Sequence, residues 1–177
     1  LMLDRPVPVE RLPGFADGLV SVQDPAAQMA AALLDPAPGS RVLDACAAPG
    51  GKAAHLLERA DLDLLALDLK PSRCRRVAEN LARLGLHASL KAADCARLDT
   101  WWDGRPFDAV LTDVPCTASG VVRRNPDAKW LRRETDIASF AKTQARILDA
   151  LWQVVQPGGE LLYVTCSVFS EENTGQI

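Results

Sequence analysis

Two cysteines lie at the ends of apolar runs of strand length, and both are candidates for covalent chemistry. Cys116 lies in DVPCTASG, directly after the apolar run FDAVL, and Cys166 ends the run ELLYVTC. A thiol attacks as its thiolate, so a cysteine beside a strand-end carboxylate such as Asp113 suits nucleophilic catalysis or proton transfer. The pattern therefore raises the question of what two thiols and a carboxylate do at the ends of the predicted strands.

Carboxylates end the other apolar runs of the chain. Asp44 follows RVL, Asp68 lies in LDLLALDL, and Asp94 ends ASLKAAD. Ligands of open α/β sheets bind beyond the carboxyl ends of the strands. A single aspartate after a strand is often only a turn or capping residue, but the repetition at successive strand ends favours a binding site.

The loop DACAAPGGK (44–52) narrows the class of ligand. A P-loop would have glycine where Cys46 stands and Ser or Thr where Ala53 stands, and the dinucleotide fingerprint G-x-G-x-x-G is absent. Phosphate binding is therefore disfavoured. What remains is a loop of small residues that lets the backbone approach an extended ligand, followed by a helix N-terminus that favours a carboxylate.

The acids at the next strand ends suggest what that ligand is. Asp68, at the end of the second strand, suits a ribose diol, and Asp94 could accept a hydrogen bond from an adenine amino group. A ligand with a carboxylate, a ribose and an adenine but no phosphate describes S-adenosylmethionine. We expect it as the cofactor.

Alternating strands and helices must position these residues. Asp24 and Pro25 begin a predicted helix, Pro71 begins another that ends at Gly85, and the long helix 135–155 ends at Pro157-Gly158-Gly159. We predict five strands, and between them the alternation predicts an α/β fold with a doubly wound, mostly parallel sheet. The predicted strands are 41–45, 62–69, 88–94, 107–113 and 160–166. We treat 1–24 as an irregular lead-in and 25–177 as one catalytic domain.

Composition limits the remaining classes. A chain of 177 residues with 48% hydrophobic content can bury one core, and it has no apolar run of membrane-spanning length and no signal-peptide pattern. We expect a cytoplasmic monomer without membrane partners. The five cysteines form no C-x-x-C pair, so we expect neither a disulfide framework nor a metal, and we expect Cys74 and Cys95 only to pack in the core. A net charge of -3 excludes a globally basic nucleic-acid binder but leaves room for a basic patch.

Three motifs together resemble one enzyme family. DACAAPGGK, DVPCTASG and TCSVFSEEN, in this order and spacing, are similar to the signature motifs of the RNA cytosine-5 methyltransferases, and VVRRNPDAKWLRRETDI resembles the bacterial branch that methylates 16S ribosomal RNA. The similarity runs from about Leu12 to the last residue. It implies a Rossmann-like class I methyltransferase fold that uses S-adenosylmethionine.

The resemblance also assigns residues. It implies that Cys166 is the nucleophile, that Cys116 assists product release, and that Asp113 and Lys52 act at the same site. The cofactor site would be lined by Cys46, Ala47, Ala48, Pro49, Gly50, Gly51, Lys52, Asp68, Asp94 and Asp113. By the chemistry expected of this family, a thiolate adds to cytosine C6, C5 takes the methyl group, and the C5 proton leaves before the thiolate. Asp113 is the candidate for stabilising the N3 side of the base.

A basic segment near the second motif is a candidate RNA contact. It combines cations that can bind phosphates with one tryptophan that can stack on a base. A solvated helix face with a half-buried tryptophan is the alternative. The candidate RNA-binding residues are Arg123, Arg124, Lys129, Trp130, Arg132 and Arg133.

The chain departs from the family pattern at both ends. We find no counterpart of the helical RNA-binding domain that precedes the catalytic domain in this branch, nor of the antiparallel hairpin that follows S-E-E-N. We therefore expect a catalytic core that lacks the hairpin and leaves its fifth strand without a neighbour. Cofactor or RNA binding without catalysis remains an alternative, as does a transfer RNA substrate. A DNA cytosine-5 methyltransferase is disfavoured because its E-N-V motif is missing, and a nicotinamide dehydrogenase because the glycine fingerprint is missing.

Overall fold

The apolar runs of the sequence form the strands of one parallel sheet. The structure is a computed structural model that describes Arg5 and residues 7–177. Within these residues the sheet has five strands in the order β3-β2-β1-β4-β5, and every neighbouring pair is parallel. The strands are β1 (Arg41–Asp44), β2 (Asp63–Asp68), β3 (Ser89–Ala92), β4 (Phe107–Asp113) and β5 (Val155–Val164). The predicted α/β, doubly wound fold is confirmed.

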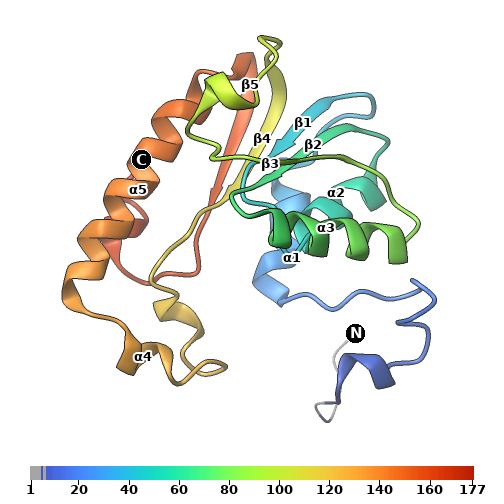
Figure 1. The fold of residues 1–177 in the computed structure, drawn as a ribbon, viewed down its shortest axis with the longest axis horizontal. Helices are drawn as coiled ribbons and strands as arrows, with labels where there is room; N and C mark the ends of the chain where they lie inside the picture. The colour runs from blue at the N-terminus through green and yellow to red at the C-terminus, as the bar shows by residue number, and fades with distance from the viewer. Residues whose placement is uncertain (1–4, 6) are drawn as a thin grey trace.

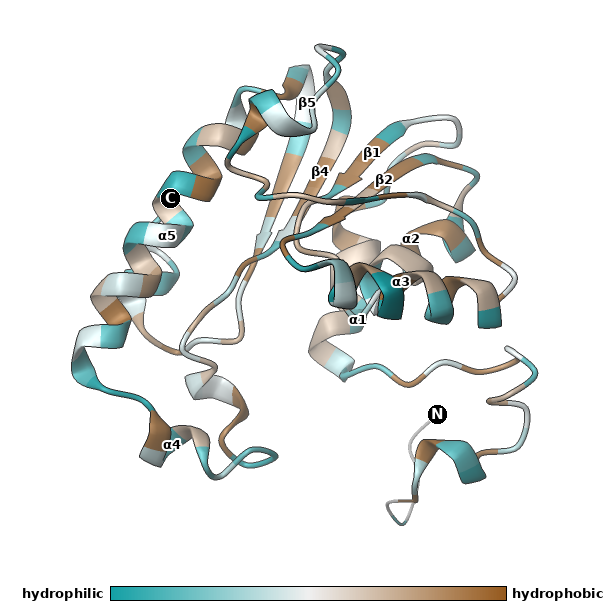
Figure 2. Ribbon diagram, viewed as in Figure 1, coloured by the Kyte–Doolittle hydropathy of each residue, from teal (hydrophilic) through white to brown (hydrophobic). Residues whose placement is uncertain are grey.

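Helices cover both faces of this sheet (Figure 1). One face packs against α1 (Pro25–Leu34), α2 (Gly51–Arg59) and α3 (Pro71–Arg83), and its core includes Ala53, Val77 and Leu111. The other face packs against α5 (Glu134–Trp152), with Phe107 and Leu151 in its core. The short helix α4 (Ala128–Leu131) lies away from the sheet. The central strands are largely hydrophobic, and α3 carries hydrophilic residues on its outer side (Figure 2). Strands buried on both faces explain the near-continuous apolar runs.

The predicted helix starts are confirmed. The Asp24 side chain accepts a hydrogen bond from the backbone N–H of Ala26 at 2.9 Å, and Pro25 is the first residue of α1. Pro71 begins α3, which ends at Arg83, and Gly85 follows with φ of 68°.

The predicted end of the long helix is wrong. The helix stops at Trp152, not at Pro157-Gly158-Gly159, because the backbone carbonyl of Val154 already accepts a sheet hydrogen bond from Phe107 at 2.8 Å. The proline and glycines instead lie inside β5, where the register shifts between Phe107↔Val155 and Ala109↔Glu160. β5 ends at Val164, so Cys166 lies in the following loop and not in the predicted strand.

The lead-in segment is irregular over its described part, with one short 3-10 turn, η1 (Val9–Arg11). Residues 1–4 and 6 lie outside the described residues. The Arg83 guanidinium of α3 fastens this segment: it donates to the backbone carbonyl of Phe15 at 2.7 Å and lies 4.0 Å from the centre of the Phe15 ring. Nowhere in the described part of the chain is a helix long and apolar enough to cross a bilayer.

Candidate active site

The strand order has a topological switch point between β1 and β4, and we call the space beyond the carboxyl ends of these two strands the crevice. These strands are neighbours, but the chain leaves β1 toward α2 on one face and continues from β4 toward α5 on the other. Such a reversal opens the space beyond the carboxyl ends of the two strands, which is the usual ligand site of a doubly wound sheet. The loop 44–52 and the segment 113–120 begin there.

The backbone of the small-residue loop is held close to the sheet. Ala45 and Ala47 donate backbone hydrogen bonds to Leu111 and Leu67 at 2.9 and 2.8 Å. Gly50 has φ of 101°, and a Cβ there would lie 3.2 Å from Val77 Cγ1, so glycine is required. α2 begins directly after Gly50 without a side-chain cap, and its first backbone amides are available to a ligand.

Asp44 is a fully buried carboxylate at the end of β1. Among the residues that the structure describes, neither of its oxygens has a hydrogen-bond partner of good geometry. Burial raises the pKa of Asp44 to about 7, against the attraction of the Lys52 ammonium. A buried acceptor without a donor is costly, so this group fits a ligand that brings an ammonium or another strong donor.

Lys52 and Asp113 form an ion pair across the crevice. Lys52 Nζ, in the first turn of α2, lies 2.5 Å from Asp113 Oδ2 at the end of β4. Their side chains are 15% and 34% exposed, so the pair is accessible from one side. The structure thus brings together two residues that the sequence assigned to one site from 61 positions apart.

The other two predicted acids, Asp68 and Asp94, each form an ion pair with an arginine. Asp68 is buried at the end of β2, accepts from the Ala48 backbone N–H at 3.2 Å, and forms an ion pair with Arg73 at 3.1 Å. Asp94 lies two residues beyond β3 and forms an ion pair with Arg146 of α5 at 3.0 Å. Asp68 therefore stays beside the loop, whereas Asp94 was wrongly placed inside a strand.

The two candidate thiols are in contact. Cys116 Sγ and Cys166 Sγ are 3.3 Å apart; Cys116 is buried and Cys166 is exposed. A hydrogen bond from the Cys166 thiol stabilises a thiolate on Cys116 and lowers the pKa of Cys116 to about 6, although burial opposes this. Cys116, in turn, raises the pKa of Cys166. The pair therefore favours one negative charge on the inner sulfur and one proton on the outer sulfur.

A buried carboxylate, Glu172, joins the two thiol-bearing loops. It accepts hydrogen bonds from Thr117 and Ser167, the residues that follow the two cysteines, and from Gln144 of α5. Burial opposes its ionisation, but these hydrogen bonds outweigh it and lower the pKa of Glu172. Sequence reasoning missed this role, because the spacing of the motif TCSVFSEEN does not show which of its two glutamates faces inward.

The basic segment borders a second cavity of about 350 Å³ next to the thiol loops. Cationic side chains and apolar groups share its wall, which includes Lys129, Arg133, Ile137 and Phe169. Trp130 is 79% exposed, and the Lys129 ammonium lies 5.0 Å from the centre of its ring.

Two of the predicted RNA-binding cations have partners within the chain. Arg124 forms an ion pair with Asp24, and Arg132 donates to the backbone carbonyl of Thr117 at 2.8 Å and lies over the ring of Phe140. These contacts make Arg124 and Arg132 structural links, which the charge pattern alone could not distinguish from free cations. Among the described residues, Arg123, Lys129 and Arg133 form no ion pair.

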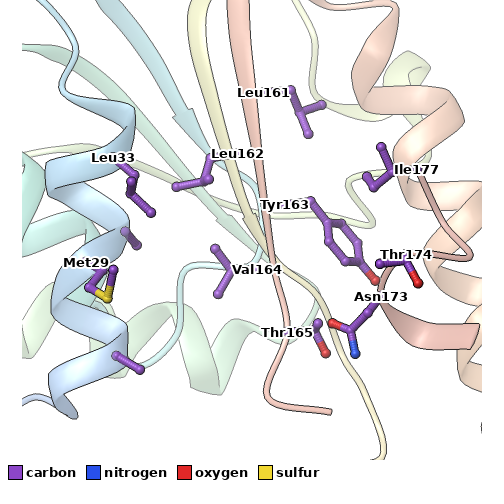
Figure 3. A pocket seen from close by; sticks show the side chains of 12 residues that line it. Met29, Leu33, Leu161, Leu162, Tyr163, Val164, Thr165, Asn173, Thr174 and Ile177 are labelled. Atoms are coloured by element: carbon purple, nitrogen blue, oxygen red, sulfur yellow. The ribbon is translucent and has the colours of Figure 1, made fainter. Parts of the chain in front are cut away.

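An apolar groove of about 830 Å³ lies between α1 and β5. Met29 and Leu33 of α1 stand opposite Leu162 and Val164 of β5, and Ile177 lies on the other side of the strand (Figure 3). Nothing in this groove suits the chemistry of the strand ends.

Comparisons with known proteins identify the family of this chain. The model of the family described as 16S rRNA methyltransferase RsmB/F matches residues 31–177. The chain belongs to the RsmB/F family. It is 58% identical to ribosomal RNA small subunit methyltransferase B of Xylella fastidiosa over the whole chain, which spans 41% of that relative. S-adenosylmethionine is the cofactor of this methyltransferase family, as the strand-end acids predicted.

Solved structures extend the likeness to the fold. The structure titled PH0851 has a TM-score of 0.92 and 35% identity, covering 97% of this chain and 40% of that one. The structure of NSun6 from Pyrococcus horikoshii with SFG, an analogue of S-adenosylmethionine, has a TM-score of 0.87 and 31% identity, covering 96% of this chain and 44% of that one. The chain thus spans less than half of each of these three proteins.

Proposed function

We propose that this chain is the catalytic domain, residues 25–177, of an enzyme that methylates C5 of a cytosine in 16S ribosomal RNA. The observation that carries the proposal is the contact between the two thiols, 3.3 Å apart, beside the ion pair of Lys52 and Asp113. Thiolate addition to C6 needs one sulfur to attack and a second group to take its proton. The 58% identity with a 16S enzyme favours ribosomal RNA over transfer RNA, and we infer a cytoplasmic location from that substrate.

The residues of the crevice fit the cofactor. The buried, unpartnered carboxylate of Asp44 suits the cofactor ammonium, and the first amides of α2 suit its carboxylate. Asp68 would bind the ribose diol if Arg73 shares its carboxylate, and Asp94 would accept from the adenine amino group if Arg146 shares its carboxylate. S-adenosylmethionine supplies an electrophilic methyl group on a sulfonium.

The two cysteines divide the covalent work. Cys166 is the exposed thiol and attacks C6 of the base, giving its proton to the Cys116 thiolate. As negative charge develops at the N3 side of the ring, Asp113 in its protonated form gives its proton to N3, and the resulting carboxylate pairs with the Lys52 ammonium. After methylation, Cys116, having passed its proton to solvent, removes the C5 proton, and the electron pair of the broken C–H bond expels Cys166 from C6.

The test is adduct trapping with S-adenosylmethionine and small-subunit ribosomal RNA, with transfer RNA in parallel. Cys116→Ser is expected to accumulate a denaturant-resistant protein-RNA adduct, and Cys166→Ser to form none. Cys74→Ser changes a thiol on α3 whose hydrogen bonds go only to the backbone carbonyls of Asp68 and Lys91, so this variant serves as control and should behave as the unchanged protein.

Two outcomes would contradict the assignment. Adducts that require Cys116 would reverse the roles of the two thiols. Cofactor binding without any adduct would favour the second candidate, a core that binds cofactor and RNA without catalysis, which the 41% coverage of the relatives keeps open.

A further inference from the structure

Each thiol is followed by a residue whose hydroxyl donates to the same carboxylate oxygen. Thr117 Oγ1 and Ser167 Oγ both lie 2.5 Å from Glu172 Oε2, and the two hydroxyl oxygens are 3.2 Å from each other. The sulfurs of the preceding residues, Cys116 and Cys166, are 3.3 Å apart. The contact between the two hydroxyls thus repeats the contact between the two sulfurs, one residue further along both loops.

The other oxygen of Glu172 fixes this unit to the fold. Oε1 accepts from the Thr117 backbone N–H at 2.9 Å and from Gln144 Nε2 at 3.0 Å. Gln144 is fully buried on α5 and also donates to the Pro115 carbonyl at 2.9 Å. The carboxylate thus ties both loops to the helix that covers this face of the sheet.

Glu172 is held by neutral donors. Its side chain is 0% exposed, and no Lys or Arg of the described part of the chain forms an ion pair with it. An anion this close to the thiols disfavours a thiolate through its charge alone. Its contribution to thiol chemistry must therefore come from geometry.

We propose that Glu172 is a positioning residue that keeps the Cys116 and Cys166 sulfurs in contact by holding Thr117 and Ser167 together. What this contact means for methylation rests on the proposed roles of the two thiols. The contact itself is measurable without RNA or cofactor.

The experiment measures alkylation of Cys116 and Cys166 by iodoacetamide from about pH 5 to 10, with each peptide quantified by mass spectrometry. In the unchanged chain the more acidic thiol is expected to titrate near pH 6, in line with the lowered pKa of Cys116. In Glu172→Gln an amide nitrogen, which cannot accept, takes the place of one carboxylate oxygen, so Thr117 and Ser167 lose their shared charge-assisted acceptor and the loops are expected to separate. The midpoint is expected to rise by about 2 pH units, toward the ordinary thiol pKa of about 8.5.

The direction of the shift separates geometry from charge. Loss of the Glu172 charge alone would lower the thiol midpoint, whereas loss of the sulfur contact raises it. At about pH 7 the thiolate fraction of the acidic thiol should fall about tenfold, but the greater nucleophilicity of the more basic thiolate offsets most of this fall, so the midpoint of the pH profile is the readout.

Glu171→Gln is the matched control, because it removes the same charge from an exposed neighbouring side chain. It should leave the profile unchanged. Thr117→Val and Ser167→Ala each remove one donor and should raise the midpoint by a smaller amount, with folding checked by circular dichroism. These two variants also keep the test decisive if Glu172→Gln fails to fold. An unchanged or lowered midpoint in folded Glu172→Gln, or in both donor variants, would overturn the proposal. Failure of adduct trapping alone would leave the midpoint shift intact and would count against the proposed function only.

Discussion

At the residue scale, several ionisable groups of the site form no ion pair with an oppositely charged side chain in the part of the chain that the structure describes. Cys116 is favoured as a thiolate by the hydrogen bond of a second thiol, Glu172 by hydroxyls and amides, and Asp44 has no hydrogen-bond partner among the described residues. By contrast, Lys52 with Asp113 and Arg73 with Asp68 form conventional ion pairs. The groups without an ion pair change protonation state readily when a ligand arrives, because little else in the fold fixes their charge.

Asp44 should therefore make cofactor binding depend on pH. Its pKa of about 7 in the free protein means that it is mostly neutral below pH 7, whereas a bound ammonium favours the carboxylate. Binding then releases a proton, and S-adenosylmethionine affinity should rise about tenfold from pH 6 to pH 8 and flatten above. Isothermal titration calorimetry measures this slope. Asp44→Asn should lose this dependence of affinity on pH. Asp61→Asn, a control on the surface, should keep it. An affinity that does not change with pH in the unchanged chain would exclude Asp44 as the group that releases the proton.

At the element scale, the two thiol loops approach each other closely because a glycine allows it. Gly120 lies in η3 (Ser119–Val121), donates its backbone N–H to the Cys166 carbonyl at 2.8 Å, and has no space for a side chain. A Cβ there would lie 2.6 Å from that carbonyl oxygen. The three linked features, Gly120, Glu172 and the thiol contact, act as one clasp between the loops after β4 and β5.

Gly120→Ala should open this clasp. We expect adduct formation with RNA to fall at least tenfold while the cofactor affinity changes less than twofold, because the loop 44–52 lies on the far side of the crevice. Adduct yield and calorimetry measure the two effects. Gly39→Ala, at φ of 82° with no neighbouring atom within 4 Å, controls for backbone strain and should affect only stability. Equal losses in both variants would argue against the clasp.

The basic segment should contribute to RNA binding through its free cations only. Lys129→Ala and Arg133→Ala should each weaken RNA binding several-fold and lower the slope of log affinity against log salt by about 0.7 per cation removed. Arg124→Ala, which breaks the ion pair with Asp24, should leave that slope unchanged. Fluorescence anisotropy at several salt concentrations distinguishes these cases, and a reduced slope in Arg124→Ala would show that the ion pair opens to bind phosphate.

The sequence predicted those elements whose signals are local. The strands β1, β2 and β4 are buried on both faces and read as apolar runs, and α1 and α3 start at prolines. The end of α5 was missed because a backbone hydrogen bond from Phe107, far away in the chain, decides it. The roles of Glu172 and Arg132 were missed for the same reason, since their partners lie 55 and 15 residues away. The contact of Cys116 with Cys166 and the ion pair of Lys52 with Asp113 agree with the expected grouping, because their segments follow neighbouring strands at one edge of the sheet, and the catalytic roles of these residues stay predictions.

At the scale of the whole molecule, one edge of the described sheet is bordered by the apolar groove between α1 and β5. Met29 and Leu33 are 57% and 63% exposed there, and large apolar side chains exposed side by side often mark an association surface. An open strand edge beside apolar side chains favours association with another chain. We therefore predict that the chain associates through this groove as its concentration rises.

Leu33→Glu should reduce this association. We expect the unchanged chain to be monomeric when dilute and to associate as its concentration rises, and the charged variant to stay monomeric over a range about tenfold wider, with unchanged cofactor affinity. Sedimentation velocity measures the change. Leu19→Glu, at an exposed leucine outside the groove, is the control and should have no such effect.

The strand order divides the chain into two consecutive stretches with different tasks. Every proposed cofactor contact except Asp113 lies between residues 44 and 94, and both thiols and the clasp lie between 113 and 172, with the ion pair of Lys52 and Asp113 as a bridge between them. Mutations in the second stretch, which is proposed to act on the methyl acceptor, can therefore accumulate without changing the residues proposed to bind the methyl donor. A lineage that changes its target RNA would rewrite the second stretch and inherit the first, and a chimaera joined between residues 94 and 107 would exchange targets while keeping its methyl donor.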